Sequence, residues 1–141
     1  MQGLTAIAEH PWAYPALEVV HIVGIALLLG NLVLVELRLW GAAPALPLRP
    51  LARLALAIAV AGFGLAAASG LLMFAAAPGE LLANRLFLLK MGLLAAAGVN
   101  AGLFHARDGL HRADAVARAQ TVLSLGLWLA VIMAGRFIAY L

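Results

Sequence analysis

Hydrophobic residues fill four long stretches of the chain, and polar residues gather between them. The stretches cover about 15–40, 51–77, 84–104 and 117–140. Each is close to the roughly 20 residues that an α-helix needs to cross the hydrocarbon core of a bilayer. The pattern therefore predicts four membrane-spanning helices.

The connectors between these stretches are short. They cover 41–50, 78–83 and 105–116, and the second contains Pro78-Gly79, for which we expect a tight turn. Short connections make consecutive helices antiparallel neighbours. We expect an all-α fold, an integral membrane antiparallel four-helix bundle, in which residues 1–141 form a single transmembrane domain.

The composition supports a lipid environment. The chain has 141 residues, of which 66% are hydrophobic and 11% are charged, and a soluble domain of this size could not bury so much apolar surface. The absence of cysteine excludes disulfides, iron–sulfur clusters and thiolate zinc sites. We expect the bilayer, and no nucleic acid, as a partner, because the nine basic residues lie mostly between the apolar stretches.

Arginine predicts the orientation. One side of the bundle holds or borders Arg38, Arg49, Arg53, Arg107, Arg112 and Arg118, whereas Arg85, at the very start of the third stretch, borders the other side. Basic residues favour the cytoplasmic side, so we expect a bacterial inner-membrane protein with both termini in the periplasm. Residues 1–14 lack Lys and Arg, and we interpret the first stretch as a retained anchor, since a cleaved signal peptide begins with basic residues.

Small residues recur in the second and third stretches and predict close helix packing. They are Gly62, Gly64, Ala66, Ser69 and Gly70, and Gly92, Ala95, Ala96, Gly98 and Gly102.

Three titratable side chains lie inside apolar stretches at nearly the same depth. His21 is six residues past Pro15, Lys90 is six past Asn84, and Arg136 is five before the C-terminus. At about 1.5 Å per residue, each lies on the order of 8–9 Å inside its helix. Helical spacing adds Glu18 to the face of His21 and Tyr140 to that of Arg136. Ionisable groups at such depths are costly and mark functional sites.

Three hypotheses remain open for this group. In the first it is structural: Glu18 pairs with Arg136, the Lys90 side chain extends toward the water interface, and His21 forms a hydrogen bond within the bundle. In the second it binds a b-type haem, with His21 as axial ligand of the iron and with Lys90, Arg136 or Arg85 facing the propionates. In the third, His21 and a methionine bind copper, which the scattered methionines disfavour.

Other polar residues carry weaker predictions. Glu36 is expected to pair with Arg53 or Arg118, and Asn31 and Asn100 are expected to bridge helices through amide hydrogen bonds. His105 falls at the opposite side from His21, where we expect a surface role or a second haem.

Several sequence phrases resemble an uncharacterised bacterial family of four-helix membrane proteins. They are Trp12-Ala-Tyr-Pro15, Glu18-Val-Val-His21-Ile-Val-Gly24, Leu37-Arg38-Leu39 with Gly41, Asn84-Arg-Leu-Phe-Leu-Leu-Lys90 with Asn100 and Phe104-His105, and Gly135-Arg136-Phe-Ile-Ala-Tyr140. The resemblance covers nearly the whole chain and implies no particular activity.

Two characterised groups are similar at a greater distance. In the HemJ-type protoporphyrinogen oxidases, a first-helix His implicated in haem b binding and a third-helix Lys match His21 and Lys90. In the CopD copper-resistance family, a Lys and a following Asn resemble Lys90 and Asn100. The Arg and His residues that follow the first helix of HemJ have no counterpart here beyond Arg38.

Together these features favour a cytochrome-like protein that binds haem b through His21, with Lys90, Arg136, Glu18, Arg85 and Tyr140 around it. It would transfer electrons with a redox partner or quinone, and any enzymatic activity would be that of a membrane oxidoreductase. The alternatives are a non-catalytic accessory subunit of a larger membrane complex or homo-oligomer, and copper passage.

Overall fold

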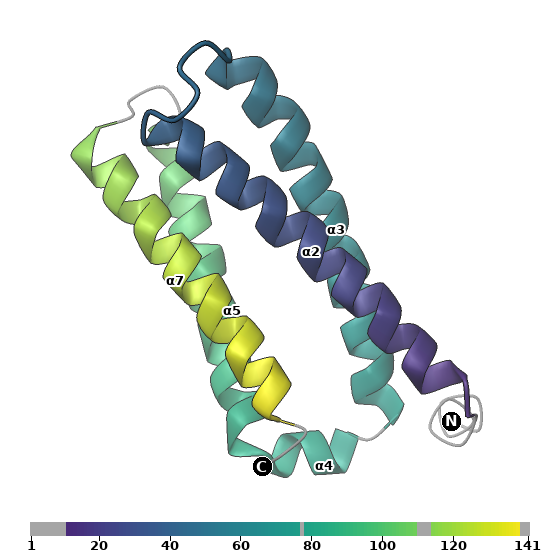
Figure 1. The fold of residues 1–141 in the computed structure, drawn as a ribbon. Coiled ribbons are helices and arrows are strands. Elements are labelled where there is room, and N and C mark those ends of the chain that lie inside the picture. Colours follow the sequence, from purple (N-terminus) through teal and green to yellow (C-terminus); the bar gives the residue numbers. More distant parts are fainter. Residues whose placement is uncertain (1–10, 77, 110–113, 139–141) are drawn as a thin grey trace.

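The computed structural model describes residues 11–76, 78–109 and 114–138. Its four long helices are α2 (Ala13–Leu39), α3 (Leu48–Ala76), α5 (Arg85–Ala106) and α7 (Ala115–Phe137), as Figure 1 shows. The described residues contain no strand. The predicted all-α four-helix bundle is therefore confirmed.

All four long helices have the length and apolar composition needed to cross a membrane. Large apolar side chains on each of them are exposed, including Ile22, Val60, Val99 and Met133 at 59–70%. Such side chains are stable where lipid surrounds them. The fold is that of a multi-pass membrane protein.

A short helix, α4 (Pro78–Ala83), replaces the predicted tight turn. Pro78 is its first residue, where proline suits a helix because its fixed φ is helical and its missing N–H needs no partner. Asn84 then caps α5, since its side-chain oxygen accepts the N–H groups of Leu86 at 2.9 Å and Phe87 at 3.4 Å. Asn84 therefore precedes the helix that it was expected to begin.

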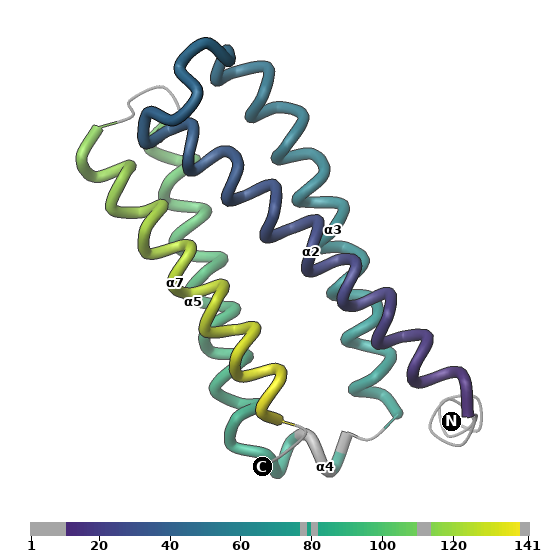
Figure 2. The backbone as a smooth tube through the Cα atoms, in the orientation of Figure 1, coloured from purple at the N-terminus to yellow at the C-terminus, as the bar shows by residue number. Residues whose placement is uncertain are grey.

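The long helices form two antiparallel hairpins, α2–α3 and α5–α7. Figures 1 and 2 show the hairpins meeting at the end where α2 and α5 finish and spreading apart at the end where α2 begins. Buried Leu39, Phe104 and Ala117 join the two hairpins at the closed end. The open end is the end at which the sequence places His21 and Lys90.

The backbones of α2 and α3 touch at Gly24 and Gly62. A Cβ atom added to Gly24 would lie 2.6 Å from the carbonyl oxygen of Gly62, and one added to Gly62 would lie 2.7 Å from that of Gly24. Small residues permit such contact between membrane helices. This crossing sets α2 and α3 in a fixed register on either side of it.

The other predicted small-residue contacts divide into two groups. Ala66 and Ser69 are buried, and Gly70 faces the His21 ring. In contrast, a Cβ atom at Gly64, Gly92, Gly98 or Gly102 would meet nothing within 4 Å. The expected close packing is therefore wrong for these four glycines.

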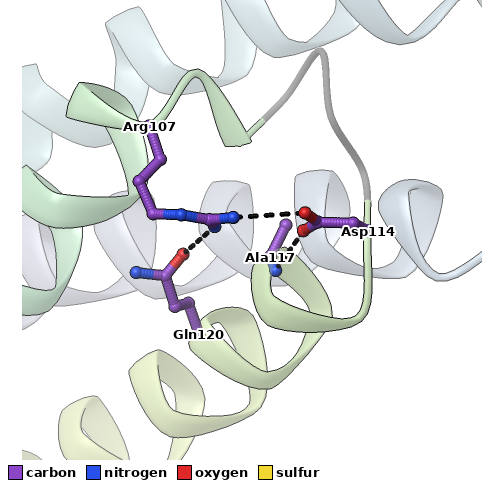
Figure 3. Close-up of polar contacts among 4 residues, drawn as sticks. All are labelled: Arg107, Asp114, Ala117 and Gln120. Carbon is purple, nitrogen blue, oxygen red and sulfur yellow. Dashed lines mark hydrogen bonds and ion pairs between the residues drawn. The ribbon is translucent and has the colours of Figure 1, made fainter.

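Charged residues tie α5 to the start of α7. Arg107 forms an ion pair with Asp114 at 3.1 Å and donates to the side-chain oxygen of Gln120 at 3.2 Å, as Figure 3 shows. Asp114 also accepts the N–H of Ala117 at 2.8 Å and so caps α7. These contacts hold the first turns of α7 against the end of α5.

Candidate functional site

The His21 imidazole lies on α2 one turn before the Gly24 crossing and faces α3. Its Nδ1 atom is 2.9 Å from the carbonyl oxygen of Ala66 and 3.1 Å from Oγ of Ser69. A carbonyl oxygen only accepts hydrogen bonds, so Nδ1 carries the proton and donates it. The Ser69 hydroxyl donates to the carbonyl of Leu65 at 2.7 Å, so it too serves His21 as an acceptor.

This hydrogen bond leaves Nε2 of His21 unprotonated. In a neutral imidazole with the proton on Nδ1, Nε2 has a free lone pair. Histidines that bind metal almost always donate their other ring N–H to a carbonyl or carboxylate. His21 therefore has the tautomer and support of a metal ligand.

Gly70 leaves room for the imidazole. A Cβ atom at this position would lie 3.4 Å from Cε1 of His21, at the short limit of ordinary van der Waals contact. The ring therefore lies directly against α3 at Gly70.

Lys90 approaches His21 from the other hairpin. Its half-buried side chain lies along α7, because Nζ is 3.2 Å from the place that a Cβ atom of Gly135 would occupy. Its ammonium charge is near enough to act electrostatically on the His21 imidazole. The structure thus brings together two of the residues singled out in the sequence, one from each hairpin.

The remaining predicted site residues lie closer to the surface. Glu18, Arg85 and Arg136 are exposed, and Arg136 is in the last turn of α7, where a cation suits the helix dipole. Tyr140 lies outside the described residues. The buried and half-buried part of the site therefore consists of His21, its α3 partners and Lys90.

His105 belongs to the opposite end of the molecule. It is exposed near the end of α5, and its ring makes an edge contact with Phe104 at 5.3 Å between centroids. Among the described residues, no group of three or more His, Asp or Glu side chains could hold a metal ion. The described residues therefore offer no site at which several such side chains bind one metal ion directly.

Glu36 is a buried carboxylate whose partner differs from the predicted one. It is 4% exposed, and the hydroxyl of Ser124 on α7 is its hydrogen-bond partner. The expected pairing with Arg53 or Arg118 is wrong, because both arginines are exposed and neither forms an ion pair with Glu36 in the part of the chain described. The sequence signal for the burial of Glu36 was its position inside the first apolar stretch.

A small cavity adjoins Glu36 between the two hairpins. Its volume is about 60 Å³, and its polar lining consists of Glu36, Asn100, His105, Gln120, Thr121 and Ser124. The predicted bridging role of Asn100 is confirmed, since its amide donates to the carbonyl of Gln120 on α7 at 2.8 Å. The predicted bridging role of Asn31 is wrong, because its amide donates to the carbonyl of Leu27 in its own helix at 2.7 Å.

Neither a protein-family model, nor a curated protein, nor a solved structure matches this chain. The resemblance to HemJ-type and CopD-type proteins therefore stays a prediction, and the functional argument depends on the geometry of the site.

Proposed function

We propose that the protein binds a b-type haem at the open end of the bundle, with His21 as an axial ligand, and transfers electrons in the bacterial inner membrane. The observation that carries the proposal is the hydrogen bond from Nδ1 of His21 to the Ala66 carbonyl at 2.9 Å. That bond leaves Nε2 unprotonated, with a lone pair available to a metal.

The residues present fit the chemistry of such a group. A neutral imidazole is a usual axial ligand, and the haem would supply one-electron redox chemistry. Lys90 reaches the same region from α5, and the exposed Arg85 and Arg136 lie toward the end of the bundle where propionates would meet water. Each cation would contribute a charge-assisted hydrogen bond of about 1.5–3 kcal/mol.

The α3 backbone has a separate role in this proposal. The Ala66 carbonyl fixes the ring orientation of His21, and a carbonyl acceptor also makes the imidazole a more basic ligand. Because Gly24 and Gly62 hold the helices in contact one turn away, this orientation does not depend on a mobile side chain. The ligand is therefore oriented before any cofactor arrives.

The proposed orientation in the membrane follows from arginine. Arg38, Arg53, Arg107 and Arg118 lie at or near the closed end of the bundle, where α2 and α5 finish, and would face the cytoplasm. The His21 end and both termini would then face the periplasm, so electrons would pass to or from a periplasmic or quinone partner.

Haem content tests the proposal. We expect detergent-purified wild-type protein to show a Soret band and one haem per chain, whereas His21→Gln should retain less than about a tenth, since no other described side chain offers a supported imidazole there. His105→Gln is the matched control and should retain wild-type haem. If the wild-type protein lacks haem after expression with ample haem precursor, the result would contradict the proposal and favour an accessory subunit. Stoichiometric copper in place of haem would favour copper passage.

A further inference from the structure

We propose that the cavity beside Glu36 binds a small monovalent cation such as Na⁺. This site lies between α2, α5 and α7 near the closed end of the bundle and is separate from the His21 site. It would give the protein a cation-binding function independent of haem.

The first argument is the uncompensated charge. Glu36 is 4% exposed, and its Oε2 atom is buried without a hydrogen-bond partner among the described residues. Burying an ionised carboxylate without a counter-charge costs several kcal/mol. Its one hydrogen bond, from Ser124, leaves most of its acceptor capacity unused.

The second argument is the set of neutral oxygen atoms around the cavity. Asn100 uses its amide nitrogen to bind Gln120, which leaves its carbonyl oxygen available. Thr121 accepts from Nε1 of Trp40 at 2.7 Å and donates to the carbonyl of Arg118 at 2.7 Å, so its hydroxyl oxygen keeps a lone pair. Carboxylate, carbonyl and hydroxyl oxygens are the ligands that hard cations prefer.

The third argument concerns the nearest cation. His105, the basic residue in the cavity lining, is exposed. Arg107, which contacts the lining residue Gln120, is held by Asp114 and by the side-chain oxygen of Gln120. Its charge is thus already paired at the edge of the cavity. Glu36 has no arginine or lysine partner in the part of the chain that is described.

Charge and size then select the cation. One carboxylate is neutralised by one positive charge, whereas a divalent ion would leave a net charge in an apolar interior, which is costly. A volume of about 60 Å³ holds a small ion with a few waters. The charge therefore favours a monovalent ion over Ca²⁺, and the volume admits Na⁺ or K⁺.

Thermal unfolding of the full-length protein in detergent tests this site. The measurement is made at pH 8 and constant ionic strength in NaCl, KCl or choline chloride. We expect the Tm to be higher in NaCl than in choline chloride by about 3 °C or more and to rise with the Na⁺ concentration, because an ion that binds the folded state stabilises it. KCl should also raise the Tm relative to choline chloride, because the cavity admits either ion.

Variants assign the response to the cavity. Glu36→Gln keeps the side-chain volume and should fold but lose the dependence on Na⁺, and Ser124→Ala should need a several-fold higher Na⁺ concentration for the same shift. Glu18→Gln removes an exposed carboxylate from the same helix and should respond as the wild type does. For Glu36→Gln, the Tm in NaCl is compared with the Tm of the same variant in choline chloride. A lower overall stability of the variant therefore does not hide the result.

Equal Tm values in NaCl, KCl and choline chloride would overturn the proposal, as would a sodium response that persists in Glu36→Gln. A Tm that changes with pH and not with the cation would identify Glu36 as a protonated acid and would also overturn it. None of these outcomes affects haem content, so the two proposals fail separately.

Discussion

At the scale of single residues, His21 and Glu36 show how differently two ionisable groups are held in one membrane bundle. His21 donates through Nδ1 to a backbone carbonyl at 2.9 Å, which leaves a directed lone pair on Nε2. Glu36 keeps a buried oxygen that has no hydrogen-bond partner among the described residues. The first arrangement suits a ligand for a metal, and the second suits a site that an ion completes.

Lys90 provides a prediction at this scale. If its ammonium pairs with a haem propionate, Lys90→Ala should weaken haem binding by roughly ten- to a hundredfold, because it removes a charge-assisted hydrogen bond of about 1.5–3 kcal/mol. Lys90→Arg keeps the charge and the donors, and should retain low-spin haem. The measurement is haem titration into apoprotein with optical spectra. A high-spin spectrum in Lys90→Arg would instead identify Lys90 as an iron ligand, since guanidinium offers no lone pair.

Ser69 provides a milder prediction. Its hydroxyl is the second acceptor for the His21 N–H at 3.1 Å, while Ala66 supplies the shorter bond. We expect Ser69→Ala to retain haem and to change the midpoint potential by a few tens of millivolts, because the ligand loses part of its polarisation. Redox titration of the purified variant measures this. Complete loss of haem would mean that Ser69, rather than the Ala66 carbonyl, orients the ring.

At the scale of helices, the crossing of α2 and α3 is the feature that positions His21. Gly24→Leu places a side chain where the backbone of α3 lies within 2.7 Å. We expect it to lower stability by at least about 1–3 kcal/mol, the usual cost of overpacking, and to reduce haem binding because His21 moves away from Ala66. Gly30→Leu is the control on the same helix, since nothing lies within 4 Å of its added Cβ atom. Unfolding in detergent compares the two, and equal stability would mean that the helices separate at no cost.

The helices themselves were predictable, because roughly 20 consecutive apolar residues have few alternatives to a membrane-spanning helix. Partners between helices were harder to predict. Asn31 and Asn100 look alike in sequence, yet Asn31 bonds its own helix and Asn100 bonds α7. The difference depends on which face of each helix meets a neighbour, and apolar residues on all sides of these helices conceal that face.

The same limit applies to the candidate site. Depth along the helix placed His21 and Lys90 at one level, which needs only the rise per residue. Their approach, and the role of Ala66, depend on the rotation of α2 and α3 about the Gly24–Gly62 contact. The partner of Glu36 was predicted wrongly for a similar reason. Arg53 and Arg118 lie at the same end of the bundle, but both are exposed and neither pairs with Glu36 in the part of the chain described.

At the scale of the whole molecule, the hairpins meet at one end and spread apart at the other, as Figure 1 shows. The meeting end, where α2 and α5 finish, is rich in arginine, and His21 lies toward the end where α2 begins. The two ends therefore have different chemistry, and the orientation in the membrane decides which compartment each faces. We expect a C-terminal alkaline phosphatase fusion to be active and a C-terminal green fluorescent protein fusion to be dark, because basic residues favour the cytoplasmic side. The reverse pattern would place the His21 end at the cytoplasm and change the proposed electron partners.

The most direct test of the central claim uses a protein whose sole histidine is His21. The chain has four histidines, so replacing His10, His105 and His111 with glutamine leaves one imidazole. The optical spectrum of the purified variant, measured with its haem content, should match the wild type in both, whereas adding His21→Gln should remove the Soret band. Loss of haem from the protein that keeps His21, or full haem in the protein that lacks it, would contradict the assignment of His21 as the axial ligand.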